Sequence, residues 1–253
     1  MRPITATIIT LNEEEHLPAC IESVRPVCDE VIVVDSGSTD RTVEVARALG
    51  ARVLEQPYLG DGPQKAFAVP QARNDWILSI DADERLEEDA VAAIGGLDLD
   101  RDDVDAYALR RRSFVGNHWI RAAGFYPDYV VRLYHRGRAG YLPRKAHSRV
   151  EARRVVRLQA HLRHLTYRDV AHWVERINAL TSYDAWAAYE RGRRARPWTP
   201  ALHAAAALVR KLILKGGILQ GMDGWNVAVT TAFHAYVKYW KLLERQRRED
   251  GPR

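Results

Sequence analysis

The chain has 253 residues, enough for one large α/β domain or for a domain of roughly 150 residues with an appendage. Its 47% hydrophobic and 28% charged residues describe a folded protein and exclude long disorder. Only two cysteines occur, Cys20 and Cys28, without zinc-ligand spacing, so a disulfide framework or a zinc module is not expected.

The charge is distributed unevenly along the chain. Residues 1–100 contain 8 Lys/Arg and 20 Asp/Glu, whereas residues 101–253 contain 30 and 13. The carboxylates of the acidic first part are candidates for binding a metal or sugar hydroxyls. The basic second part is expected to attract anions. Nucleic acid, acidic lipid and phosphorylated glycan are all candidate partners, and solvated surface arginine is the structural alternative.

Short apolar runs alternate with helical patterns in the first hundred residues. This alternation predicts βαβ units with a mostly parallel sheet, with strands at 4–10, 31–34, 52–55 and 76–80. The pattern then changes: residues 107–112 and 130–134 are predicted as further strands.

Beyond about residue 167 the chain is predicted to be helical. The expected helices are 169–191, 200–215 and a third that places Trp225, Val229, Phe233 and Trp240 on one face. That face is compatible with either core packing or a membrane interface. We therefore predict a catalytic domain at 1–165 and a basic helical region at 166–253. Residues 201–214 are too short an apolar segment to span a bilayer.

Polar side chains follow three of the predicted strands. The first strand leads to Thr10, Asn12 and Glu13, and the second to Asp35 and Ser36. Ligands of open parallel sheets bind beyond the carboxyl ends of the strands. The sequence therefore places a binding crevice at this edge.

Asp81-Ala82-Asp83 follows the fourth strand. Two carboxylates two residues apart can share one hard cation, and Mg²⁺ or Mn²⁺ prefers such oxygen ligands. The glycine-rich loops of dinucleotide enzymes and of P-loop NTPases do not occur, so phosphate must be held differently. Lys65 is a candidate phosphate contact, with a plain surface lysine as the alternative.

Several segments together resemble the family 2, inverting glycosyltransferases of the GT-A fold: Thr10 to Glu14, Val33 to Asp40, and Leu78 to Glu84. Further segments resemble bacterial lipopolysaccharide core β-glucosyltransferases: Gly62 to Lys65, Trp119 to Arg121, Gly124 to Tyr129, Arg132-Leu133, and the glycines from Gly216 to Gly221. The resemblance covers nearly the whole chain.

The resemblance implies roles for individual residues. Thr10 and Asp35 would hold uracil and Glu13 the ribose of a UDP-sugar. Asp81 would contact ribose or sugar, and Asp83 the metal that bridges the diphosphate. Such a cation would neutralise charge that develops on the departing diphosphate.

One position departs from the pattern of the resembled subgroup. Its members usually carry a His-Glu pair after the segment that follows Arg132-Leu133, whereas this chain has His147-Ser148. A serine cannot accept a proton from an acceptor hydroxyl near neutral pH. Asp128, Glu151 and His147, in that order, are the candidates for the base, and each also has an ordinary structural explanation.

We therefore predict a metal-dependent, inverting hexosyltransferase that moves a sugar, with glucose as the first candidate, from a UDP-sugar to a lipopolysaccharide core or another lipid-linked glycan. We expect a cytoplasmic protein, peripheral on the inner face of the inner membrane, that does not bind nucleic acid. The alternatives are a weak or inactive sugar-nucleotide-binding homologue, because of Ser148, a nucleic-acid binder and a nucleotidyltransferase.

Overall fold

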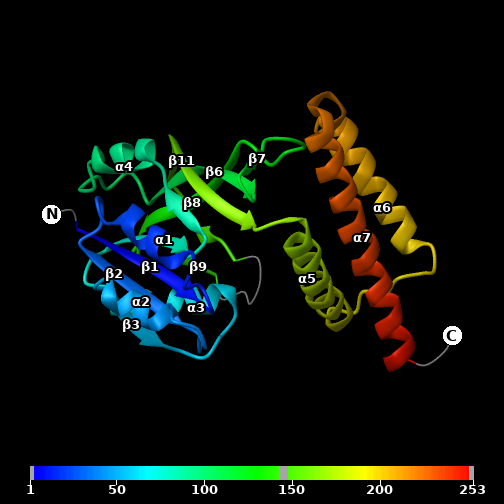
Figure 1. The fold of residues 1–253 in the computed structure, drawn as a ribbon, viewed down its shortest axis with the longest axis horizontal. Helices are drawn as coiled ribbons and strands as arrows, with labels where there is room; N and C mark the ends of the chain where they lie inside the picture. Colours follow the sequence, from blue (N-terminus) through cyan, green and yellow to red (C-terminus); the bar gives the residue numbers. More distant parts are fainter. Residues whose placement is uncertain (1–2, 143–147, 251–253) are drawn as a thin grey trace. The chain divides into compact units, whose positions relative to one another are not determined.

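The computed structural model describes residues 3–142 and 148–250. The chain forms two compact units (Figure 1). The sheet unit contains Met1–Arg112 and Asp128–Leu165, and the helical unit contains Ser113–Pro127 and Thr166–Arg253. The segment Ser113–Pro127 therefore belongs to the same unit as the helices that follow residue 165.

Four parallel strands form the first half of the main sheet, in the order β3-β2-β1-β4. Helices follow β1, β2 and β3 and provide the crossovers that parallel strands require. The bounds are β1 Ile4–Thr10, α1 Leu17–Val24, β2 Glu30–Asp35, α2 Thr42–Ala48, β3 Arg52–Glu55, α3 Asp61–Phe67 and β4 Trp76–Asp81. All four predicted strands of this half are present.

Antiparallel strands extend the sheet from β4 in the order β8-β6-β11-β5, with β7 paired to β6 and a separate β9-β10 hairpin. Their bounds are β5 Glu84–Leu86, β6 Ala106–Val115, β7 His118–Ile120, β8 Asp128–His135, β9 Gly140–Tyr141, β10 Val150–Glu151 and β11 Val155–Tyr167; α4 is Glu88–Gly95. The sequence analysis predicted β6 and β8 but not β11. The predicted fold class, α/β with a C-terminal helical extension, is confirmed.

The core of the sheet unit follows the two-residue alternation of its strands. Val33 packs in one buried cluster with α1, whereas its neighbours Ile32 and Val34 pack in a second cluster. Successive side chains of a strand point to opposite faces, so both faces of the parallel block are buried. This explains why the second strand is a continuous apolar run.

A buried carboxylate lies at the amino end of the parallel strands. Glu30, at the start of β2, accepts hydrogen bonds from Thr5 Oγ1 (2.8 Å) and Arg73 N (2.8 Å), and it pairs with Arg52 (3.2 Å). Burial alone would raise the pKa of the Glu30 carboxyl, but the hydrogen bonds from Arg73 and Thr5 and the charge of Arg52 lower it further than burial raises it. Glu30 is therefore ionised in the folded protein.

Three long helices make up most of the helical unit: α5 Val170–Glu190, α6 Thr199–Val209 and α7 Gly221–Glu249. Asp169 caps α5 by accepting a hydrogen bond from His172 N (2.7 Å). In α7 the predicted aromatic face is largely exposed, including Phe233 and Trp240, whereas Val227 and Leu242 are buried. No helix in the described part of the chain is both long and apolar enough to cross a membrane.

Two glycines bring α7 against the turn that precedes it. A π-helical turn at Arg210–Leu214 and a 3₁₀ turn at Gly217–Gln220 connect α6 to α7. A Cβ atom on Gly224 would overlap the carbonyl oxygen of Gly217. The two backbones therefore touch, and only glycine fits at position 224 without a shift of one segment.

We expect Glu30→Gln to lower the free energy of unfolding at pH 7 by about 1–3 kcal/mol, because hydrogen bonds to a charged group are lost. Since the folded-state pKa is lowered, the carboxylate contributes fully above its unfolded pKa of about 4.3 and loses that contribution as pH falls. The difference between the two proteins in urea unfolding should therefore shrink on acidification. Glu22→Gln, an exposed change on α1, is the control, and a difference independent of pH would contradict this account.

We expect Gly224→Ala to destabilise the helical unit by about 1–3 kcal/mol, as overpacking typically does. Thermal unfolding followed by circular dichroism measures the change. Gly95→Ala is the matched control, because a Cβ there has no neighbouring atom within 4 Å. Equal melting temperatures for Gly224→Ala and the wild type would show that the contact is unimportant.

Candidate active site

The register of the parallel block brings three predicted site residues to one edge of the sheet. Thr10, at the end of β1, is paired with Asp35 at the end of β2. On the other side of β1, Ile9 is paired with Asp81 at the end of β4. The carboxyl ends of three adjacent strands therefore present two aspartates and a threonine side by side.

Asp35 organises the loop that follows β2. Its carboxylate accepts hydrogen bonds from Thr10 Oγ1 (3.0 Å), Gly37 N (2.9 Å), Ser38 N (2.8 Å) and Ser38 Oγ (2.5 Å). Burial would raise the pKa of Asp35, but the hydrogen bonds from Ser38, Gly37 and Thr10 lower it overall. Four donors fill the roughly four acceptor positions of a carboxylate, so a ligand N–H would replace one of the two hydroxyls, which can rotate.

The other polar residues near this edge mainly connect segments. Asn12 has a left-handed φ of 56° and accepts a hydrogen bond from Thr39 N (2.8 Å), which ties the β1 loop to the β2 loop. Glu13 N donates to Thr42 Oγ1 (2.7 Å), and the Glu13 side chain is partly exposed. Ser36 Oγ accepts from Gln64 Nε2 (3.1 Å) on α3. Asn12 and Ser36 thus connect the loops after β1 and β2 with each other and with α3.

Asp81 lies between two buried cations. Its Oδ1 is 2.8 Å from Lys65 Nζ, and its Oδ2 is 2.8 Å from Arg132, which also pairs with the fully buried Glu84. Burial would raise the pKa of Asp81, but Arg132 and Lys65 hold it well below its usual range. We call Asp61, Lys65, Asp81, Glu84 and Arg132 the strand-end ion cluster, since Lys65 also pairs with Asp61 at 3.1 Å.

The two carboxylates of the Asp-x-Asp motif differ in their contacts. Both Asp81 oxygens are engaged by cations, whereas Asp83 contacts one imidazole nitrogen, His164 Nε2, at 3.2 Å. Among the described residues, Asp83 Oδ1 has no hydrogen-bond partner. Asp83 is therefore the better metal ligand of the two as the structure stands.

His164 was not predicted by the sequence analysis. It lies on β11, where it is paired in register with Glu84 of β5. Burial would lower the pKa of His164, but the hydrogen bond that it donates to Asp83 and the charges of Asp83 and Glu84 raise it. A carboxylate and an imidazole are both ligands for Mn²⁺, and with substrate phosphates the pair could complete a coordination shell. Only the unpredicted strand β11 brings His164 to this place.

The candidate bases occupy different surroundings. Asp128 Oδ2 accepts two hydrogen bonds from Arg111, at 3.0 and 2.7 Å. Glu151 is exposed on β10 and makes no contact with the strand-end ion cluster in the described ranges. His147 lies outside the described residues. Ser148 donates from both N (3.1 Å) and Oγ to Asp61 Oδ2, which places it beside the cluster.

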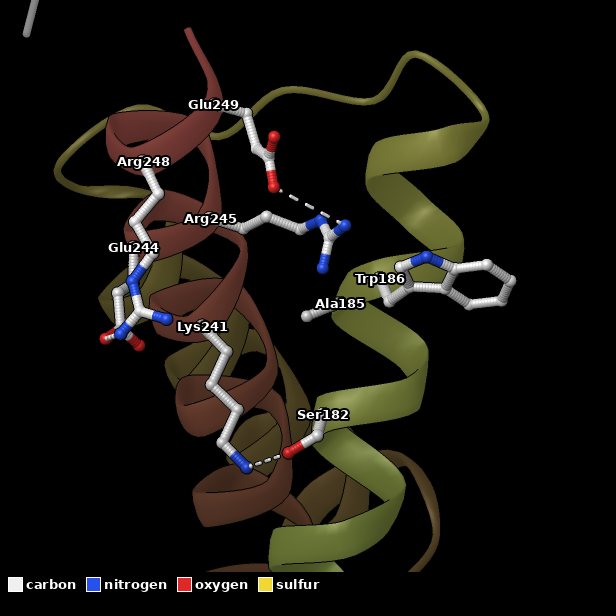
Figure 2. A pocket seen from close by; sticks show the side chains of 8 residues that line it. All are labelled: Ser182, Ala185, Trp186, Lys241, Glu244, Arg245, Arg248 and Glu249. Atoms are coloured by element: carbon white, nitrogen blue, oxygen red, sulfur yellow. Dashed lines mark hydrogen bonds and ion pairs between the residues drawn. The ribbon is translucent and has the colours of Figure 1, made fainter. Parts of the chain in front are cut away.

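A second hollow occurs in the helical unit, between α5 and α7 (Figure 2). Lys241 and Arg245 line it, but both are already partnered. Lys241 Nζ donates to Ser182 Oγ (2.7 Å), and Arg245 lies 3.6 Å from Glu249. These contacts stabilise the helix pair and leave the strand-end edge as the stronger candidate site.

Comparisons with known proteins identify the family of this chain. The family model for glycosyl transferase family 2 matches residues 5–165. The lipopolysaccharide core biosynthesis glycosyltransferase LpsC of Rhizobium meliloti is 29% identical over 261 residues, covering 96% of this chain and 93% of that protein. An uncharacterised glycosyltransferase of Rickettsia typhi is 51% identical over 89 residues, and this match spans only 30% of that protein and 35% of this chain.

Among solved structures, glucosyl-3-phosphoglycerate synthase from Mycobacterium tuberculosis, in complex with Mn²⁺, UDP and its product, is 29% identical. That match covers 46% of this chain and 45% of the other, with a TM-score of 0.35. The family model covers most of the chain, including every strand-end residue described above. This chain belongs to glycosyl transferase family 2.

Proposed function

We propose that the protein transfers a sugar, glucose, from a UDP-sugar to a lipid-linked glycan of the lipopolysaccharide core, with Mg²⁺ or Mn²⁺. The observation that carries the donor side is the meeting of Asp35, Asp81 and Asp83 at the carboxyl edge of adjacent parallel strands. This edge is where open α/β sheets bind nucleotides.

The electrostatics of the site support the metal requirement. In the strand-end ion cluster three carboxylates outnumber two cations, and Asp83 adds a further negative charge nearby. A diphosphate brought to this surface would be repelled unless a divalent cation were bound. Asp83 and His164 are the residues that would hold it, and it would neutralise the charge of the leaving diphosphate.

The protein's own groups would orient the donor. Thr10 and Asp35 offer hydroxyl and carboxylate groups to the base, and Glu13 can accept hydrogen bonds from the ribose. Lys65 lies at the base of the crevice, where its ammonium would face phosphate or sugar oxygens if its pairing with Asp81 or Asp61 loosened. The acceptor hydroxyl would then attack the anomeric carbon in a single displacement, with inversion as the family resemblance implies.

The acceptor assignment rests on two supports. LpsC, which acts in lipopolysaccharide core biosynthesis by its name, aligns with this chain over nearly its full length. In addition, the α6–α7 turn and the helix ends beside it expose a group of large apolar side chains, which we call the hairpin surface: Val209, Ile213, Leu214, Ile218, Leu219, Met222 and Trp225. An exposed apolar patch of this kind is typical of an interaction site.

Basic residues accompany the hairpin surface. Arg210 and Lys215 are exposed next to Leu214, which is 76% exposed. Apolar side chains flanked by cations are typical of segments that lie in the interface of an anionic membrane. We propose that this surface attaches the enzyme to the membrane face that carries its lipid-linked acceptor, on the cytoplasmic side of the inner membrane.

We expect UDP binding to require a divalent cation. Asp83→Ala and His164→Ala should each weaken UDP affinity in Mn²⁺ by about tenfold or more, because a contact to a charged group contributes about 1.5–3 kcal/mol. Calorimetry with Mn²⁺ and with EDTA measures this, and Asp100→Ala, an exposed change in the same unit, is the control. Equal affinities in Mn²⁺ and EDTA would refute the metal role. A panel of UDP-sugars in the same assay tests the choice of glucose.

We expect the wild type to bind anionic vesicles at low salt and to dissociate at high salt, since each basic residue near such a surface contributes about 1 kcal/mol. The double variant Leu214→Glu/Leu219→Glu should lose most of this binding, because two apolar anchors become charged. Flotation with phosphatidylglycerol vesicles measures it. The matched control is Val170→Glu, the same kind of change at an exposed valine of α5, which should bind normally. Unchanged flotation of the double variant would refute the hairpin surface as the anchor.

A further inference from the structure

Ser148 raises the question of which group accepts the proton of the acceptor hydroxyl. The resembled enzymes usually carry a glutamate at this position, and the serine hydroxyl cannot replace it near neutral pH. In the structure Ser148 is in direct contact with another carboxylate. Its backbone N lies 3.1 Å from Asp61 Oδ2, and its hydroxyl donates to the same oxygen.

Asp61 is fixed by the way α3 is attached to the sheet. Gln64, which is fully buried, donates to Ser36 Oγ and to Gln56 O, each at 3.1 Å, and accepts from Leu59 N. These bonds anchor the first turn of α3 at the carboxyl end of β2. Asp61 and Lys65 are four residues apart, so they lie on the same side of the helix.

The position of Asp61 relates it directly to the candidate donor site. Lys65 Nζ lies 3.1 Å from Asp61 and 2.8 Å from Asp81, so one ammonium connects the two carboxylates. Asp61 is partly exposed, with 26% of its side chain accessible, as is Asp128 with 36%. What distinguishes Asp61 from Asp128 and Glu151 is its direct contact with Ser148.

We propose that Asp61 supplies the carboxylate missing at position 148 and accepts the proton of the acceptor hydroxyl, with Ser148 and Lys65 as its positioning residues. This inference rests on the proposed function. Ser148 and Lys65 provide three donors, which leaves about one of the four acceptor positions of the carboxylate open to a substrate hydroxyl.

The step balances with groups already named. The acceptor O–H proton passes to Asp61, and the oxygen lone pair forms the new bond to the anomeric carbon. The bond from that carbon to the diphosphate oxygen breaks, and its electron pair leaves on UDP. Asp61 then releases the proton to water and returns to its charged form.

The test uses the full chain, UDP-glucose and a deacylated lipopolysaccharide core oligosaccharide, with UDP release as the readout. Asp61→Asn keeps the size of the side chain and should lower kcat by about 10²- to 10⁴-fold, because base catalysis acts only in the transition state. UDP affinity in Mn²⁺ should change far less than kcat, because Asp61 reaches the candidate donor site only through Lys65. Glu88→Gln, an exposed change on α4, is the activity control.

A second pair of variants separates proton transfer from a structural role. The double variant Asp61→Asn/Ser148→Glu should have a kcat at least about tenfold higher than that of Asp61→Asn, because a carboxylate returns to the same place. Formate should partly rescue Asp61→Ala for the same reason. In the wild-type background Ser148→Glu should lower activity, because two carboxylates would then crowd one site.

The outcomes are distinct. Loss of kcat in Asp61→Asn, with rescue by Ser148→Glu, supports the proposal. Full activity of Asp61→Asn, together with loss in Asp128→Asn or Glu151→Gln, overturns it and assigns the base to one of those residues. A wild type that binds UDP-glucose but gains transfer only with Ser148→Glu also overturns it, because the site then lacks a base. A wild type that does not bind UDP-glucose would instead refute the proposed function.

Discussion

The strand-end ion cluster is the constraint on which the candidate site depends. Asp81 and Glu84 are carboxylates at the end of β4 and in β5, and their charges are compensated by Lys65 from α3 and Arg132 from β8. A buried charge left without its partner costs several kcal/mol, so the pairs of Lys65 and Arg132 with Asp81 and Glu84 hold these four elements together. The helix, the parallel block and its antiparallel extension are thereby fixed to one another at the edge where the ligand is expected.

This arrangement also gives different properties to residues that look equivalent in sequence. Asp81 and Asp83 are two residues apart, yet one is enclosed by cations and the other faces an imidazole and open space. Ser148 and Asp61 are far apart in sequence, yet the backbone N and the hydroxyl of Ser148 both donate to one carboxylate oxygen of Asp61. The chemistry of each group is set by its neighbours across the sheet edge more than by its residue type.

The helical unit poses a different physical problem. Its interior is small, with Val227 and Leu242 among the few fully buried residues, while large apolar side chains remain at its surface. A soluble helix pair usually hides such residues. The unit thus presents an apolar surface bordered by cations, and the proposed membrane attachment rests on this surface.

The sequence alone determined the βαβ order, the four parallel strands and the strand-end residues Thr10, Asp35, Asp81 and Asp83, because apolar runs, polar strand ends and parallel topology are local patterns. It also identified the family through contiguous motifs. β11, and therefore His164, was not predicted, although Leu158, Ala160 and Leu162 alternate with polar residues and pack in the core. The pairing partners of this strand are distant in sequence, so only the structure places His164 beside Asp83. Nor could it show that α7 leaves its aromatic face exposed, since a helical period is the same for a buried and an open face. The partners of Asp61, Lys65 and Arg132 were decided only by tertiary structure, because ion pairing depends on which distant elements the sheet register brings within a few ångströms.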